Sequence, residues 1–209
     1  VALRNGTPDA GLHALAFQYA RYLLVASSRP GTLPATLQGI WNDSLAPPWE
    51  SKWTININAQ MNYWLAEVGN LAECHQPLFD LLEAAREDGR RTASTLYGAS
   101  GFVAHHNLDV WGRATPVDGA KWGLWPLGAA WLALHLWDHW AFGRDRDFLA
   151  TRAYPVMREA ATFLLDFLIP HPDHPDLLVT APSLSPENQY QLPDGTVVSL
   201  CVAPAMDSQ

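Results

Sequence analysis

The stretch PLGAAWLALHLWDHW, residues 126–140, is the strongest indicator of the fold class. Its apolar side chains are distributed nearly all round the 3.6-residue period of an α-helix, so we expect a helix that is buried on most sides. Helical periodicity also dominates the sequence before and after this stretch. Together these patterns favour an all-α fold.

Four further segments repeat apolar residues at helical spacing. The first covers residues 9–27, and the second is short and begins at Asn58, whose side chain we expect to cap it. The third and fourth begin near Pro77 and Pro155, because proline is well suited to the first turn of a helix. The stripes that we expect to be buried consist of Leu12, Leu15, Ala16, Tyr19, Tyr22, Leu23 and Ala26; Met61, Trp64, Leu65 and Val68; Leu78, Leu81, Leu82 and Ala85; and Val156, Ala160, Phe163, Leu164 and Phe167.

Long connections rich in Trp, His, Asn and Pro separate these segments, at residues 29–57, at 97–121 and after 170. Structureless loops of this length are usually functional or disordered, and this composition is not that of disorder. We therefore expect about five or six helices, almost no sheet apart from a hairpin around Pro193, Asp194 and Gly195, and no repeat of fixed period. The functional residues should lie in the loops.

Composition excludes several classes of protein. Hydrophobic residues make up 48% of the 209 and charged residues 16%, yet no apolar run is long enough to cross a bilayer. A net charge of −8 without a basic stripe argues against a nucleic-acid partner. Cys74 and Cys201 each lack a nearby second cysteine, so we expect neither a disulfide framework nor a zinc site. Ten tryptophans are unusual, and they suit both core packing and stacking against a ring-shaped ligand such as a sugar.

The first candidate cluster is WTININAQMNYW, where Asn56 and Asn58 alternate with Ile55 and Ile57. In an extended segment this alternation directs both amides to one face and both isoleucines into the core. A pair of amides can donate and accept hydrogen bonds around a water molecule or a sugar hydroxyl. The alternative is that Asn58 only caps the following helix, which leaves Asn56 unexplained.

The second cluster is VAHHNLDVWG. His105, His106 and Asp109 are possible metal ligands, but adjacent histidines on an extended chain face opposite ways, so we predict no metal and no cofactor here. Hydrogen bonding of a polyol by His106, Asn107 and Asp109, with Trp111 stacking on it, is the better hypothesis.

The third cluster is APSLSPENQY, in which Glu187 stands between a proline and an asparagine. Proline restricts the backbone on both sides of itself, so Glu187 is expected on a rigid, non-helical segment. A carboxylic acid held there among apolar neighbours would stay protonated near neutral pH and serve as a general acid. The alternative is a structural glutamate that binds nearby backbone amides.

Four long blocks resemble glycoside hydrolase family 95, the inverting α-L-fucosidases: LPATLQGIWNDSLAPPWESKWTININAQMNYWLAEVGNL, GFVAHHNLDVWG, WPLGAAWLALHLWDH and LVTAPSLSPENQY. They occur in the family's order from about residue 33 to residue 209. The resemblance implies an all-α fold that is part of an (α/α)6 barrel of the six-hairpin glycosidase type, with residues 1–209 forming the N-terminal portion, about half of the toroid. It also implies a secreted or periplasmic protein.

The resemblance further implies that Glu187 protonates the departing oxygen and that Asn56 and Asn58 hold the attacking water. The family's base is an aspartate far downstream, which nothing in this chain matches, so we expect the chain alone to be inactive until the remainder of the parent protein completes the barrel. The substrate is then a glycan ending in α-L-fucose, linked α-1,2. The residues expected to contact it are His106, Asp109, Trp111, Trp125 and Asn188.

Two other functions remain open from the sequence. L-galactose differs from L-fucose only by a hydroxyl on C6, so the resemblance is compatible with an α-L-galactosidase. A non-catalytic helical domain that binds carbohydrate would use the same Trp and Asn residues and leave Glu187 idle.

Overall fold

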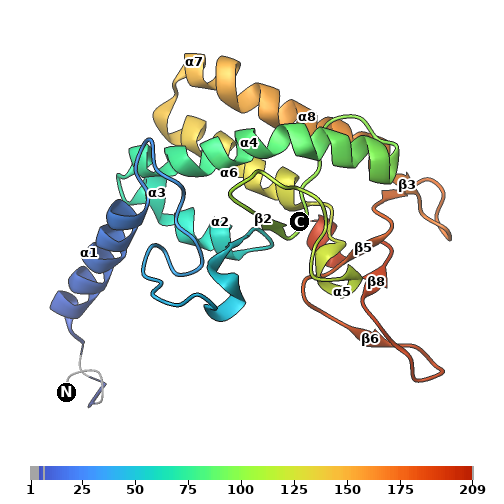
Figure 1. Ribbon diagram of the computed structural model, residues 1–209, viewed down its shortest axis with the longest axis horizontal. Helices are drawn as coiled ribbons and strands as arrows, with labels where there is room; N and C mark the ends of the chain where they lie inside the picture. The colour runs from blue at the N-terminus through green and yellow to red at the C-terminus, as the bar shows by residue number, and fades with distance from the viewer. Residues whose placement is uncertain (1–4, 7, 209) are drawn as a thin grey trace.

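The computed structural model describes residues 5, 6 and 8–208, and helices dominate its regular structure (Figure 1). The fold is all-α, as the sequence predicted. The longer helices are α1 (Ala10–Ser27), α4 (Gln76–Thr92), α6 (Gly128–Gly143) and α8 (Tyr154–Phe167). The shorter ones are α2 (Asn58–Tyr63), α3 (Leu65–Val68), α5 (Ala120–Gly123) and α7 (Arg146–Phe148). Further helical turns are η2 (Pro48–Ser51), η3 (Ala72–His75), η4 (Ala93–Tyr97), η5 (Leu149–Ala153) and η6 (Ala205–Ser208).

Short antiparallel strand pairs connect segments of the loops by backbone hydrogen bonds. They are β1 (Trp53–Thr54) with β2 (Asn107–Leu108), β3 (Ile169–Pro170) with β4 (Leu178–Val179), β5 (Ser183–Leu184) with β8 (Leu200–Cys201), and β6 (Tyr190–Gln191) with β7 (Val197–Val198). The β6–β7 pair is the hairpin predicted around residues 193–195, which is therefore confirmed.

The hydrophobic core lies where α6 packs against both α4 and α8 (Figure 1). Pro77 and Pro155 occupy the first turns of α4 and α8, where no intrahelical donor is needed, as predicted. All residues of the stripe predicted for α4 are buried. The residues of the stripe predicted for α8 are buried too, except Leu164, which is half-buried. Arg86 and Arg90 of α4 both donate to the carboxylate of Glu159 on α8, which adds a charged link between these helices.

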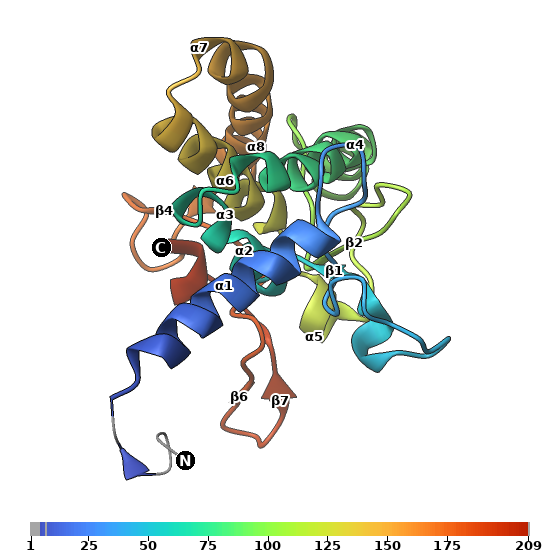
Figure 2. The same cartoon turned by 90° about the vertical axis from the view of Figure 1, so that its left-hand side faces the viewer.

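The buried face predicted for α1 is wrong. Leu15, Tyr19 and Tyr22 are exposed, and Leu24 and Ser27 near the C-terminal end are buried instead. The reason lies in the position of α1, whose N-terminal half extends away from the other helices (Figures 1 and 2). It meets α3 at its C-terminal end, so an apolar stripe further back has nothing to pack against.

The structure corrects two further expectations. In α6, Leu132 and Leu136 are buried, but Leu134 and Trp137 on the other side are about half exposed, so the helix is buried on one face and not on most sides. At the start of α2, Ile57 occupies the cap position and no side chain caps the helix, so the capping role expected for Asn58 is wrong.

The stripe predicted for residues 61–68 also faces the wrong way. Met61, Trp64 and Val68 are exposed, while Tyr63 and Ala66 enter the core. Tyr63 is fixed there because its hydroxyl accepts a hydrogen bond from the Ala35 amide (2.9 Å). Within the part of the chain that the structure describes, no helix has both the length and the apolar character needed to cross a membrane.

Candidate functional site

The segment that carries Asn56 is fixed by backbone pairing. β1 pairs with β2, and directly after β1 the Ile55 amide donates to the carbonyl oxygen of His106 (2.7 Å). Ile55 is fully buried, as predicted, but residues 55–57 form a turn, so Ile57 is exposed rather than inside the core. The pairing places the asparagine segment beside the histidine segment, although 50 residues lie between them in sequence.

Gly128 allows α6 to approach this pair of segments closely. A Cβ atom at position 128 would lie 2.2 Å from the carbonyl oxygen of His105 and 2.8 Å from Cδ1 of Ile55. Only glycine fits at such a distance, because a side-chain carbon would overlap the backbone of the facing segment. The N-terminal end of α6 is thereby seated against the residues that position Asn56 and His106.

Glu187 lies in a turn that follows β5, in agreement with the predicted non-helical segment. The Asn188 amide donates to the carbonyl oxygen of Ser185 (2.6 Å), and the Asn188 side chain donates to the Ser185 hydroxyl (3.1 Å). These two bonds close the turn around Glu187. The residue itself is exposed, so the apolar enclosure expected from the sequence is wrong for the described chain.

Asn56 and Glu187 meet across 131 residues of sequence: the Asn56 side-chain amide donates to Oε1 of Glu187 at 3.3 Å. Asn56 is only 5% exposed, so its amide is held rigidly at this contact. Both residues line a cavity of about 460 Å³, which we call the Asn56 cavity. Its other lining residues are Leu37, Gln38, Trp49, Thr54, Ile57, Asn58 and Pro186.

A second cavity of about 480 Å³ adjoins the first, and we call it the Lys52 cavity. The two cavities share Trp49, Thr54 and Glu187. The remaining lining of the Lys52 cavity is mostly polar or aromatic and consists of Pro47, Glu50, Lys52, His106, Asn107, Asp118 and Trp122. Glu187 therefore stands between two spaces, each within the range of roughly 300–1,000 Å³ in which proteins bind small ligands.

Asp118 is the electrostatic centre of the Lys52 cavity. Its Oδ2 atom accepts from the Lys52 ammonium (2.8 Å) and from the Asn107 amide (3.0 Å), and it lies 3.1 Å from Nε2 of His106. The hydrogen bond from Lys52 holds the pKa of Asp118 below its ordinary value. Burial lowers the pKa of His106, and the nearby Asp118 carboxylate only partly opposes that effect. At neutral pH the pair is therefore an ionised aspartate beside a neutral histidine.

Four of the residues proposed from the sequence lie apart from these cavities. Asp109 accepts from the backbone amides of Trp111 and Arg113 and so organises a turn, and Trp111 is 82% exposed and lines neither cavity. Asn188 also lines neither, since its amide closes the turn at Ser185. The structure does not bring these three side chains to the Asn56–Glu187 contact.

Trp125 lies apart as well. It is 1% exposed, donates from its indole nitrogen to Asp207 (3.0 Å), and lines a separate cavity of about 300 Å³. Asp207 accepts a second bond from the Thr180 hydroxyl (2.5 Å). Trp125 thus anchors the C-terminal segment to the helical core.

Sequence reasoning missed Trp49, Lys52, Asp118 and Trp122 as lining residues. Trp49 is 77% exposed, and with Glu50 and Ser51 it forms a run of three non-glycine residues at φ values of 49°, 60° and 52°. Such left-handed backbone is uncommon and clusters at ligand sites. The signal in the sequence was the Pro- and Trp-rich loop, but nothing in APPWESKW indicates a left-handed run.

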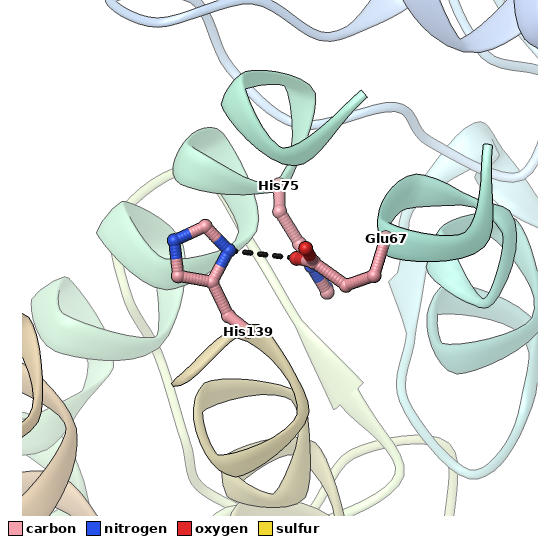
Figure 3. Close-up of side chains that lie close together, drawn as sticks. All are labelled: Glu67, His75 and His139. Atoms are coloured by element: carbon pink, nitrogen blue, oxygen red, sulfur yellow. Dashed lines mark hydrogen bonds and ion pairs between the residues drawn. The ribbon is translucent and has the colours of Figure 1, made fainter. Parts of the chain in front are cut away.

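Among the described residues, Glu67, His75 and His139 form one group close enough to hold a metal ion (Figure 3). The distances from Oε1 of Glu67 to Nδ1 of His75 (2.8 Å) and to Nδ1 of His139 (2.7 Å) are those of hydrogen bonds. Tetrahedral ligands of a zinc ion would lie roughly 3.3 Å apart. The contacts fit an ionised Glu67 that accepts hydrogen bonds from both histidines.

The network continues from this group into the core. Nε2 of His75 lies 2.9 Å from Nδ1 of His135, and the Gln76 amide reaches Nε2 of His139 at 3.4 Å. Burial disfavours ionisation of Glu67, but the hydrogen bonds from His139 and His75 outweigh it and lower the pKa to about 2. Burial also lowers the pKa of His135 to about 3. The network is therefore centred on one anion, Glu67, and burial favours the neutral forms of His75 and His135.

His105, which the sequence offered as another possible metal ligand, has both ring nitrogens engaged. Nε2 lies 2.6 Å from the Tyr97 hydroxyl, and Nδ1 lies 2.8 Å from the carbonyl oxygen of Ala114. The buried His105 ring thus links the Tyr97 side chain to the backbone at Ala114.

Comparison with known proteins places this chain in a family context. The model of the glycosyl hydrolase family 95 catalytic domain matches residues 1–209. The chain is 48% identical over 200 residues to a protein named alpha-L-fucosidase 2 from Arabidopsis thaliana, which covers 95% of this chain and 24% of that relative. It is 38% identical over 183 residues to a probable alpha-fucosidase A from Aspergillus niger, with 86% and 23% covered. The chain thus spans about a quarter of the length of these curated relatives.

Proposed function

The chain belongs to glycosyl hydrolase family 95, a family of (α/α)6 barrels, and from this premise we propose that the whole protein removes terminal α-L-fucose from glycans. The names of the two relatives support this activity. The observation that carries the proposal is the meeting of Asn56 and Glu187 at the boundary of two ligand-sized cavities. An acid with a sugar-sized space on each side suits the cleavage of a bond between two sugars.

Glu187 is the general acid of the proposed reaction. It protonates the glycosidic oxygen as the bond to the fucose breaks, and this role requires a carboxyl within hydrogen-bond reach of that oxygen. The turn closed by Asn188 and the bond from Asn56 hold the carboxyl at the boundary between the cavities. A terminal α-1,2-linked fucose is the substrate that we propose.

Asn56 and Asn58 hold the attacking water in the proposed mechanism. The sugar must separate Asn56 from Glu187 when it binds, because the water and the acid act on opposite sides of the ring; the released amide then offers its N–H groups and carbonyl oxygen to the water. An amide has no useful basicity, and the water therefore needs a carboxylate that accepts its proton. In an inverting enzyme that carboxylate lies roughly 6.5–9.5 Å from the acid, on the opposite side of the sugar.

We place that base outside this chain. Oδ2 of Asp118 already accepts from Lys52 and Asn107, and Asp207 already accepts from Trp125 and Thr180. The hydrogen bond from Lys52 also lowers the pKa of Asp118 and so weakens that carboxylate as a base. Proton acceptance by either residue would break bonds that hold the site together.

The test compares two substrates in the full-length protein. Glu187→Ala should slow hydrolysis of a 2′-fucosylated oligosaccharide by roughly 10²–10⁴-fold, the usual contribution of a general acid. It should leave α-L-fucosyl fluoride largely unaffected, because fluoride departs without a proton. Glu73→Ala, which removes an exposed carboxylate on η3, is the matched control and should change neither rate. Equal losses on both substrates for Glu187→Ala would refute the acid role.

A further inference from the structure

We propose that Gln60 is a positioning residue for the attacking water, and that its side-chain amide acts by holding the carbonyl group of Ile55. This inference rests on the proposed function and extends the part of it that concerns the water. Gln60 is the third residue of α2, is fully buried and lines neither cavity. Its effect on the reaction therefore passes through another residue.

The contact that Gln60 makes is a short hydrogen bond to the turn before its own helix. Its Nε2 atom donates to the carbonyl oxygen of Ile55 at 2.6 Å. The backbone amide of the same Ile55 donates to the carbonyl oxygen of His106 at 2.7 Å. Both backbone polar groups of Ile55 are thus bonded, and its side chain is fully buried. The peptide group that leads into Asn56 is held from two sides as a result.

This bond matters for the water because the two asparagines lie on different parts of the backbone. Asn56 belongs to the turn, and Asn58 is the first residue of α2. Gln60 ties the turn to the helix, so it maintains the separation between the two amides that hold the water. A water molecule bound by both amides is aimed correctly only while that separation is kept. A misplacement of about 1 Å can reduce a rate by roughly 10²-fold.

Packing alone does not explain a glutamine at this position. Oε1 of Gln60 is buried and has no hydrogen-bond partner among the residues that the structure describes. An unsatisfied buried acceptor costs about 1–3 kcal/mol, and an apolar side chain of similar size would avoid that cost. What the amide adds over such a side chain is its bond to Ile55.

The first variant is Gln60→Met in the full-length protein, with α-L-fucosyl fluoride as the substrate. Fluoride departs without a proton, so the acid step does not affect the comparison. Methionine keeps the length of the side chain but removes the donor. The kcat should fall roughly 10- to 100-fold because the amides are displaced, and KM should change little because Gln60 lines neither cavity. For a 2′-fucosylated oligosaccharide kcat should fall by the same factor, since water attacks both substrates.

The second variant, Gln60→Glu, supplies a readout that a packing defect would not change. Burial raises the pKa of a glutamate, to roughly 8–9 in documented cases. Below that pKa the O–H group donates to the Ile55 carbonyl, and above it the carboxylate repels the carbonyl oxygen. The ratio of kcat for Gln60→Glu to kcat for the wild type should therefore be near one at pH 6.5 and should fall in a one-proton step as the pH rises to 10. Each kcat is expressed per folded molecule, from circular dichroism at the same pH.

Gln76→Met is the matched control, because it makes the same substitution at a half-buried glutamine of α4 that lines neither cavity. It should leave kcat unchanged on both substrates. A wild-type kcat in folded Gln60→Met, or a Gln60→Glu ratio that does not change with pH, would overturn the positioning role. A loss confined to the oligosaccharide would overturn it too, because Gln60 would then act on the acid. If Gln60→Met does not fold, the pH dependence of Gln60→Glu decides alone.

The proposed function fails in a different way. A wild-type protein that releases fucose from neither substrate refutes it without any variant, whereas the role of Gln60 is refuted only by the variants of an active protein.

Discussion

Acid should destabilise this protein through His135, beginning as the pH falls below about 6.5. The His135 ring is 4% exposed, and its burial lowers its pKa from 6.5 in a solvated histidine to about 3. Between these two values the unfolded chain takes up a proton that the folded chain cannot accept. A histidine with a lowered pKa therefore contributes its full stability above pH 6.5 and loses that contribution as the pH falls.

The magnitude follows from the size of this window. One proton taken up only by the unfolded chain reduces the free energy of unfolding by about 1.4 kcal/mol for each pH unit. At pH 5.0 the loss from His135 is therefore about 2 kcal/mol relative to neutral pH. His75 acts in the same direction, because burial lowers its pKa too. Glu67, with a pKa of about 2, loses its contribution only below pH 4.5, so the histidines are responsible for the first decline.

The assay is denaturant unfolding of the full-length protein at pH 7.0 and pH 5.0, for the wild type and for His135→Asn. Asparagine keeps an N–H donor for His75 but does not titrate. We expect His135→Asn to be less stable at pH 7.0, because it leaves part of the histidine volume unfilled. Its loss of stability between the two pH values should be smaller than that of the wild type by about 2 kcal/mol.

His13→Gln is the matched control, because His13 is exposed on α1. This variant should keep the full pH dependence of the wild type. If His135→Asn shows the same decline as the wild type, the buried imidazole does not govern acid stability and the reasoning is refuted.

Three other outcomes follow from the packing and the proposed chemistry. Gly128→Ala should lower the free energy of unfolding by about 1–3 kcal/mol or more, since its Cβ would overlap a backbone oxygen at 2.2 Å. Denaturation curves measure this loss, and an unchanged midpoint would contradict the close packing of α6 against residues 105 and 55. Asn58→Ala should slow glycan and fluoride hydrolysis in parallel, because water attacks both substrates, whereas a loss confined to the glycan would assign Asn58 to the acid side instead. Glu159→Gln should lower the melting temperature, because it removes an anion bound by Arg86 and Arg90; the expected loss in the free energy of unfolding is about 1–3 kcal/mol. Added salt should reduce the difference from the wild type, and a difference that does not depend on salt would argue against the ion pair as its cause.

The sequence predicted the buried faces of α4 and α8, and it failed for the faces of α1, α2 and α3. The stripes of α4 and α8 are buried because α6 covers them. The stripe of α1 has the same periodicity, but Tyr19 and Tyr22 are exposed because no described helix lies opposite them. Periodicity states which face of a helix is apolar, and it cannot state whether a partner is present.

The sequence pointed to individual candidate residues, but it could not show which other residues surround them. Asn56 and Glu187 were singled out from local patterns, but their 3.3 Å contact spans 131 residues and depends on the β1–β2 and β5–β8 pairings. Lys52 and Asp118 form an ion pair that lines the Lys52 cavity. The residues next to each of them in sequence do not indicate this contact. Trp125 looked like a binding residue, but its indole N–H is used by Asp207 inside the protein.

Helix α6 joins two regions that can be engineered independently. Gly128 at its start is seated against the segments that carry the candidate site, and His139, eleven residues later, belongs to the Glu67 network. At 1.5 Å per residue these positions are roughly 16 Å apart, a separation at which the effects of substitutions usually add. Replacing the whole network by apolar side chains of similar volume is the route to an acid-tolerant variant, since buried charged groups are often dispensable when all partners are exchanged together. The pH range of stability and the turnover rate can therefore be optimised in separate mutant libraries, and the best substitutions can be combined afterwards.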